Sequence, residues 1–157
     1  KPFGNLSVFE NTLVASTFGA NRFSKKLKED NAIQALQTTG IFEKRNEIAG
    51  QLRLLDRKRL ELARVIASNP ELVLLDEIAG GLSDLELPKL IQIIRNLISS
   101  GITVIWIEHL MHALSEVVQD LFCLYGGEII ARGKPTEVLN NEKVIDLYLG
   151  SSFEVNK

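Results

Sequence analysis

The feature that most constrains this chain is a strand–helix–strand pattern in residues 72–107. Residues 72–75 form a short, continuous aliphatic run, which is typical of a strand covered on both faces. Residues 87–98 repeat apolar side chains at the spacing of an amphipathic helix, and Gly101 ends it. Residues 102–107 form a second apolar run, rich in β-branched side chains. Because a helix connects them, the two strands are expected to be adjacent and parallel, as in an α/β fold.

The residues before this unit are predicted to be mostly helical. Ser7 and Glu10 have the spacing of a capping box, so a helix is expected to begin at Val8. Apolar spacing predicts two further helices, each followed by a glycine or a proline that ends it. The three predicted helices cover residues 8–18, 26–39 and 57–68, and residues 41–56 are expected to form a loop.

The residues after this unit predict a hairpin and a short tail. Residues 121–125 and 128–131 are apolar runs joined by Gly126-Gly127, a typical hairpin turn. A short helix up to Val118 precedes them, and Pro135 opens a tail of short helices to about Leu149. We therefore predict three parts: a helical subdomain that includes the helix at residues 57–68, an α/β core, and a C-terminal tail. Their bounds are residues 1–69, 70–133 and 134–157.

Length and composition exclude several classes of protein. The 157 residues suffice for about one domain, and a net charge of −2 argues against a nucleic-acid partner. No apolar run approaches the roughly 20 residues that span a bilayer. The single cysteine, Cys123, excludes a disulfide framework within the chain and suits a reducing cytoplasm. The single methionine is Met111, so Lys1 is not expected to be the native start.

Polar side chains follow both predicted strands. Asp76-Glu77 comes directly after the first strand, and Glu108-His109 comes at the end of the second. Parallel strands place their carboxyl ends at one edge of the sheet, where open α/β folds bind ligands. A magnesium–nucleotide site needs a carboxylate for the metal, a base for water and a polar group near the terminal phosphate. Each residue alone also fits an ordinary strand end or solvated loop, and Glu108 is given no role; the joint arrangement favours function.

These residues resemble the motifs of ATP-binding cassette (ABC) ATPases. Residues 72–77 resemble the Walker B motif, and Gly80-Gly81-Leu82-Ser83 stands where the family has its D-loop. Residues 104–109 are similar to the strand and switch histidine of the H-loop. Residues 59–71 resemble the helix and turn that link the signature motif to Walker B. The resemblance covers nearly the whole chain.

The resemblance implies a partial P-loop NTPase, with a RecA-like parallel sheet, and the cofactors ATP and Mg²⁺. It implies that Asp76 holds Mg²⁺ through water, that Glu77 polarises the attacking water, and that His109 contacts the γ-phosphate. The further nucleotide-binding residues that it implies are Arg53, Leu54, Leu55, Asp56, Gly81, Leu82 and Ser83.

The resemblance also implies partners and a location. ABC ATPases work as head-to-tail dimers of ATPase subunits that drive transmembrane permease subunits from the cytoplasmic face of the inner membrane. Residues 128–138 and 144–150 resemble the tail of the branched-chain amino acid uptake class, and a generic amphipathic C-terminus is the alternative. The expected function is therefore an ATP-hydrolysing transporter subunit, with no nucleic-acid partner.

The sequence departs from the family at its phosphate-binding loop. No Walker A motif stands between Lys1 and Lys157, since Gly133-Lys134 is followed by Pro135 rather than Ser or Thr. The glutamine of the Q-loop is expected just before Lys1. The chain by itself is therefore not expected to bind or hydrolyse ATP, although the intact protein is.

A second departure concerns the signature motif, Leu-Ser-Gly-Gly-Gln in the family and residues 52–56 here. Leu55 is expected to crowd the approach of backbone amides to phosphate. Arg53 either contacts phosphate as a cation or belongs to a degenerate motif. Ile78 replaces the usual proline after Walker B, which changes loop stiffness more than chemistry. The alternative function is a weakened or truncated subunit that acts as a non-enzymatic interaction partner.

Overall fold

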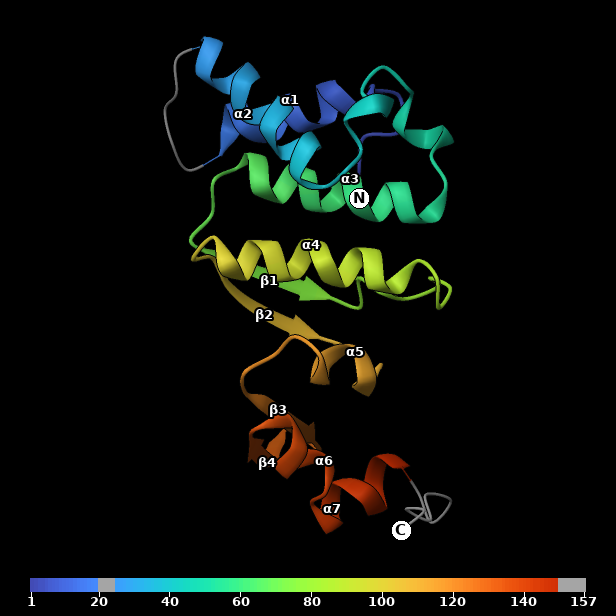
Figure 1. The fold of residues 1–157 in the computed structure, drawn as a ribbon, viewed down its shortest axis with the longest axis vertical. Coiled ribbons are helices and arrows are strands. Elements are labelled where there is room, and N and C mark those ends of the chain that lie inside the picture. The colour runs from blue at the N-terminus through green and yellow to red at the C-terminus, as the bar shows by residue number, and fades with distance from the viewer. Residues whose placement is uncertain (20–24, 150–157) are drawn as a thin grey trace. The chain divides into compact units, whose positions relative to one another are not determined.

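The computed structural model describes residues 1–19 and 25–149, which fall into two compact units with a boundary between His109 and Leu110 (Figure 1). Each unit is described by itself. The division predicted at residues 69 and 133 stays a prediction. Among the described residues, none of the helices has both the length and the apolar character needed to cross a bilayer.

The first unit begins with three helices that pack on one another: α1 (Val8–Phe18), α2 (Lys25–Thr38) and α3 (Leu54–Ala67). The capping box is present, since Ser7 Oγ accepts from the Glu10 amide at 3.1 Å and Glu10 Oε2 accepts from the Ser7 amide at 2.7 Å. The predicted bounds of α1 are confirmed, and those of α2 differ by one residue. The shared core contains Val8, Ala35, Leu36, Ile41, Ala49, Leu52, Leu60, Ala63 and Ala67.

The prediction that residues 41–56 form a loop is wrong at its end, because α3 begins at Leu54. Arg53 has the extended backbone of an N-cap residue, and Leu55 in the first turn is buried. The packing of Leu55 offsets the weak capping, since Arg53 makes no side-chain cap. The loop before it contains two short 3₁₀ turns, η1 (Phe42–Lys44) and η2 (Ala49–Gln51).

The predicted strand–helix–strand unit is confirmed: β1 (Leu72–Asp76), α4 (Leu87–Ser99) and β2 (Thr103–Ile107). The two strands pair in parallel, with a register that runs from Leu72 opposite Thr103 to Asp76 opposite Ile107. In Figure 1, α4 runs alongside this strand pair. The buried residues of α4 follow the predicted spacing and are Leu87, Leu90, Ile91, Ile93, Ile94 and Leu97.

The prediction that the strands are covered on both faces is wrong for the described residues. Successive side chains of a strand point to opposite faces, and in β1 Val73 and Leu75 are buried while Leu74 is 70% exposed. Ile107 in β2 is 62% exposed. The second face of the strand pair therefore presents apolar side chains that no described residue covers fully.

The second unit is built around the predicted hairpin. Strands β3 (Leu121–Tyr125) and β4 (Glu128–Gly133) are antiparallel, and Gly126 and Gly127 at the turn have φ values of 57° and 85° that favour glycine. Helix α5 (Met111–Ser115) precedes them and ends earlier than predicted. Helices α6 (Pro135–Leu139) and α7 (Glu142–Val144) and the π-helical turn η3 (Ile145–Leu149) follow them.

Candidate active site

The candidate site lies where β1 and β2 end. The register sets Asp76 opposite Ile107, and the Glu77 amide donates to the Ile107 carbonyl at 2.9 Å, which extends the ladder by one bond. His109 Nδ1 lies 4.0 Å from Glu77 Oε1, and both side chains are about two-thirds exposed (65% and 67%). The structure therefore brings together the carboxylate and the imidazole that the sequence assigned to catalysis, and leaves both open to solvent.

The backbone of Glu77 is in the left-handed region, with φ of 45°. A residue with a side chain adopts this conformation at a cost, and it persists where the surroundings fix it. The Ile107 carbonyl holds the Glu77 amide, and the Glu77 carbonyl accepts from the Gly80 amide at 3.2 Å. The chain thus turns sharply from β1 into the next loop at the residue assigned as the base.

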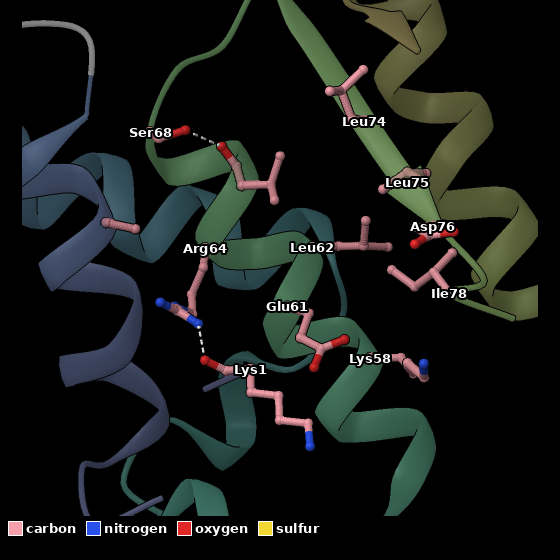
Figure 2. A pocket seen from close by; sticks show the side chains of 12 residues that line it. Lys1, Lys58, Glu61, Leu62, Arg64, Ser68, Leu74, Leu75, Asp76 and Ile78 are labelled. Carbon is pink, nitrogen blue, oxygen red and sulfur yellow. Dashed lines mark hydrogen bonds between the residues drawn. The ribbon is translucent and has the colours of Figure 1, made fainter. Parts of the chain in front are cut away.

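Asp76 lines a cleft of about 420 Å³ between α3 and β1. Figure 2 shows Asp76 on the β1 side of this cleft, with Lys58, Glu61 and Arg64 on the α3 side. No cluster of three metal-ligating side chains is found among the described residues. A single accessible carboxylate still fits Mg²⁺, which commonly uses one or two carboxylates together with phosphate oxygens and water.

The D-loop residues begin a turn that leads into α4. Gly81 has φ of 79°, which favours glycine. The amide and the hydroxyl of Ser83 donate to Glu86 Oε2 at 3.0 and 2.8 Å, and these bonds hold the pKa of Glu86 below its ordinary value. The Ser83 hydroxyl is therefore engaged at the start of α4, and Leu82, which precedes it, is half-buried.

Of the five residues in place of the signature motif, Leu52 is buried in the core, and the other four divide into two pairs. Arg53 and Leu54 are exposed at the start of α3. Leu54 Cδ2 lies 3.0 Å from the position that a Cβ on Gly81 would occupy, so the signature segment and the D-loop approach each other closely at this glycine. This contact was not predicted from the sequence.

The second pair, Leu55 and Asp56, is engaged within the chain. Leu55 is buried, so its side chain does not project at the start of the helix as expected. Asp56 pairs with Lys44 Nζ at 2.8 Å and with Arg59 Nη1 at 3.4 Å. The hydrogen bond and the charge of Asp56 raise the pKa of Lys44. Asp56 thus fastens the first turn of α3 to the preceding loop.

Glu108 is the residue of the site that sequence reasoning missed. Its side chain is fully buried, and Oε1 accepts from the Ala79 amide at 2.7 Å. A glutamate next to an apolar strand was the available signal, since buried carboxylates are retained only with hydrogen-bond partners.

Known proteins resemble this chain in sequence. A family model for the branched-chain amino acid ATP-binding cassette transporter matches residues 128–154. The lipopolysaccharide export system ATP-binding protein LptB of Escherichia coli K12 is 32% identical over 153 residues, which cover 98% of this chain and 63% of LptB. The high-affinity branched-chain amino acid transport ATP-binding protein LivG of Salmonella typhimurium is 33% identical over 164 residues, with 96% and 64% covered. The chain thus spans less than two thirds of these relatives.

Solved structures agree on the fold. The ATP-binding cassette MJ1267 of an ABC transporter, in its ADP conformation, superposes with a TM-score of 0.81 at 23% identity. The match covers 94% of this chain and 64% of that cassette. The chain therefore has the fold of part of an ATP-binding cassette, and its sequence is similar to ABC ATP-binding proteins over nearly its whole length.

Proposed function

We propose that this chain is the part of an ABC transporter ATPase that carries the catalytic carboxylate and the switch histidine, and that the intact protein binds and hydrolyses MgATP. The observation that carries the proposal is the distance of 4.0 Å between His109 Nδ1 and Glu77 Oε1 at the ends of two parallel strands. This edge is where α/β folds bind nucleotides, and a base with a polar phosphate contact beside it suits phosphoryl transfer to water.

The side chains divide the work of hydrolysis. Asp76, in the cleft beside α3, would hold Mg²⁺, which neutralises phosphate charge when it is bound. Glu77 would orient and polarise the attacking water. His109, exposed beside Glu77, would donate to the γ-phosphate, and this bond would hold the loop after β2 in place while the phosphate is bound. Loss of that phosphate would free the loop, which links hydrolysis to movement.

Two of the remaining assigned residues, Arg53 and Leu54, would serve a second ATPase subunit. Arg53 is exposed at the N-terminus of α3, where a cation can reach a phosphate held by a partner. Leu54 touches Gly81, so movement of the signature segment would also reach the D-loop. Transmembrane permease subunits would bind the helical part of the chain, which places the protein at the cytoplasmic face of the membrane.

The transported substrate that we propose is a branched-chain amino acid. The match of the family model to residues 128–154 and the identity with LivG support this class. Lipopolysaccharide export is the second candidate, because LptB is as similar to this chain as LivG is. Uptake of labelled leucine, and lipopolysaccharide at the cell surface, would be compared in the source organism with and without the gene. Loss of leucine uptake alone supports the first, and loss of surface lipopolysaccharide alone supports the second.

A weakened ATPase is the alternative activity. It is favoured by Arg53 and Leu55, which stand where the family has a serine and a glycine. The rate of phosphate release by the intact protein, purified with its permease, distinguishes a working ATPase from a weakened one. Turnover of about 1 per second or more in MgATP is expected of a working transporter subunit. Binding of ATP without turnover would support the non-enzymatic partner and would overturn the proposed activity.

A further inference from the structure

We propose that Glu108 is a positioning residue, whose buried carboxylate ties the loop after Glu77 to the backbone of His109 and so fixes the spacing of the two catalytic groups. The proposal rests on the function proposed above, because it assigns Glu108 a part in the same reaction. It adds a residue that does not itself touch the nucleotide.

The carboxylate of Glu108 spans two segments of the chain. Oε1 accepts from the Ala79 amide at 2.7 Å, in the loop that follows Glu77. Oε2 accepts from the His109 amide at 3.3 Å and lies 3.7 Å from His109 Nδ1. One side chain thus contacts the segment of the base on one oxygen and the histidine on the other.

Because the carboxylate of Glu108 is buried, the loss of either contact would leave a polar group without a hydrogen-bond partner. The Glu108 side chain and Ala79 are both fully buried, so water does not readily replace either partner. A buried carboxylate is tolerated where N–H groups satisfy its oxygens, and a bond to a charged acceptor is stronger than one between neutral groups. A carboxylate offers an acceptor on each of its two oxygens, which an amide of the same size does not.

The two hydrogen bonds of Glu108, to the Ala79 and His109 amides, act beside a strained backbone. Ala79 stands two residues after Glu77, whose φ of 45° persists only while its surroundings hold it. The Glu77 amide is held by the Ile107 carbonyl of β2 and the Ala79 amide by Glu108, so both ends of the turn are fixed to the segment that leads from β2 to His109. Release of the Ala79 end would let Glu77 move relative to His109.

Glu108→Gln tests this in the intact protein. The amide places an oxygen on one side and an NH₂ group on the other, so either Ala79 or His109 then faces a donor. Glu108→Asp keeps both acceptor oxygens on a shorter arm. Glu71→Gln is the matched control, because Glu71 is exposed and lies at the opposite end of β1. Steady-state kcat and KM are measured for each variant, together with amide hydrogen exchange at Ala79, His109 and Thr103.

The expected result for Glu108→Gln is a loss of roughly 10- to 100-fold in kcat, with KM changed less than about 2-fold, since misplaced catalytic groups slow chemistry more than binding. Exchange at the Ala79 or His109 amide should rise about tenfold or more, while the Thr103 amide, which donates to the Glu71 carbonyl, keeps its protection. Glu108→Asp should retain more kcat than Glu108→Gln, and Glu71→Gln should match the parent.

Several results would overturn the proposal. Parental kcat in Glu108→Gln would show that the tie does not position the catalytic groups, while the proposed ATPase function would stand. Unchanged exchange at both amides would show that the tie does not form. If the parent itself hydrolysed no ATP, the ATPase function would fail, and the exchange data would still decide whether the carboxylate joins the two segments. Should Glu108→Gln not fold, Glu108→Asp decides the question. A rise in its KM as large as its fall in kcat would contradict a positioning role.

Discussion

His109 Nδ1 lies 4.0 Å from Glu77 Oε1, although the two residues follow different strands. The parallel register of β1 and β2 produces this approach, because it sets the last residue of each strand opposite the other. The pair is exposed, so a nucleotide could reach both side chains without rearrangement of the core. The geometry makes His109 the first residue to test.

We expect His109→Ala in the intact protein to lower kcat about 100-fold or more, because it removes the donor that we propose for the γ-phosphate, whose charge changes in the reaction. ATP affinity should change only a few-fold, since most phosphate contacts lie elsewhere. His112→Ala is the control, because His112 is the only other histidine and is exposed on α5. Phosphate release and equilibrium ATP binding give the two quantities. A variant that hydrolyses ATP like the parent would remove His109 from the reaction.

Arg53 tests the altered signature motif. If Arg53 reaches the nucleotide of a partner subunit, Arg53→Ala should weaken ATP-driven dimerisation about tenfold, and Arg53→Lys should restore it in part, because lysine keeps the charge and loses the planar guanidinium. Lys89→Ala, at an exposed position of α4, controls for the loss of one positive charge. Analytical ultracentrifugation with ATP measures the dimer. Parental dimerisation in both Arg53 variants would mean that the motif is degenerate.

The capping box of α1 makes a pH-dependent contribution to stability. Hydrogen bonds from the Ser7 amide and hydroxyl hold the pKa of Glu10 below its ordinary value. A lowered pKa in the folded state stabilises the fold above the unfolded pKa, and this stabilisation is lost as pH falls through the folded pKa. Glu10→Gln should therefore be less stable than the parent at neutral pH, with a difference that shrinks on acidification.

Urea unfolding between neutral pH and about pH 3 measures that difference. Glu43→Gln removes the same charge from an exposed position outside α1 and serves as the control. A parent-minus-variant difference that stays constant with pH would contradict the role of the Glu10 carboxylate.

Much of the fold follows from local patterns. The period of apolar residues in α4 and the Ser7–Glu10 spacing are properties of short segments, so the sequence predicts them well. The start of α3 could not be read in this way, since no local pattern shows that Leu55 in its first turn is buried. Coverage of the strands on both faces is likewise a tertiary property.

In the candidate site, too, some features could be predicted from the sequence and others could not. The ends of β1 and β2 could be predicted to meet, because parallel pairing is a rule of topology. The bond between Glu108 and Ala79 could not, since it depends on how the loop after Glu77 turns. The contact of Leu54 with Gly81 joins two motifs that the sequence shows only as separate segments.

The 157-residue chain itself is expected not to bind MgATP specifically. Phosphate affinity in P-loop proteins comes from a ring of backbone amides and a lysine at a helix N-terminus, and the sequence encodes no such motif. Asp76 and Glu77 present negative charge to a polyanion. The exposed apolar side chains of the strand pair, with Leu74 and Ile107 among them, should also favour self-association.

Isothermal titration with MgATP and light scattering of the same sample test both expectations. We expect no saturable heat and a mass above that of the monomer. Saturable micromolar binding by a monomer would show that the nucleotide site lies within these 157 residues.

Glu77→Gln in the intact protein tests the catalytic assignment most directly. Glutamine keeps the size of the side chain and the neighbouring Asp76 but cannot accept a proton from water, so kcat should fall about 100-fold or more while ATP still binds. Glu71→Gln, at the exposed start of the same strand, should hydrolyse ATP like the parent. The measurement is the rate of phosphate release at saturating MgATP, with ATP affinity determined on the same preparations. Loss of turnover with retained binding is the predicted result, and turnover within a few-fold of the parent would show that Glu77 is not the base.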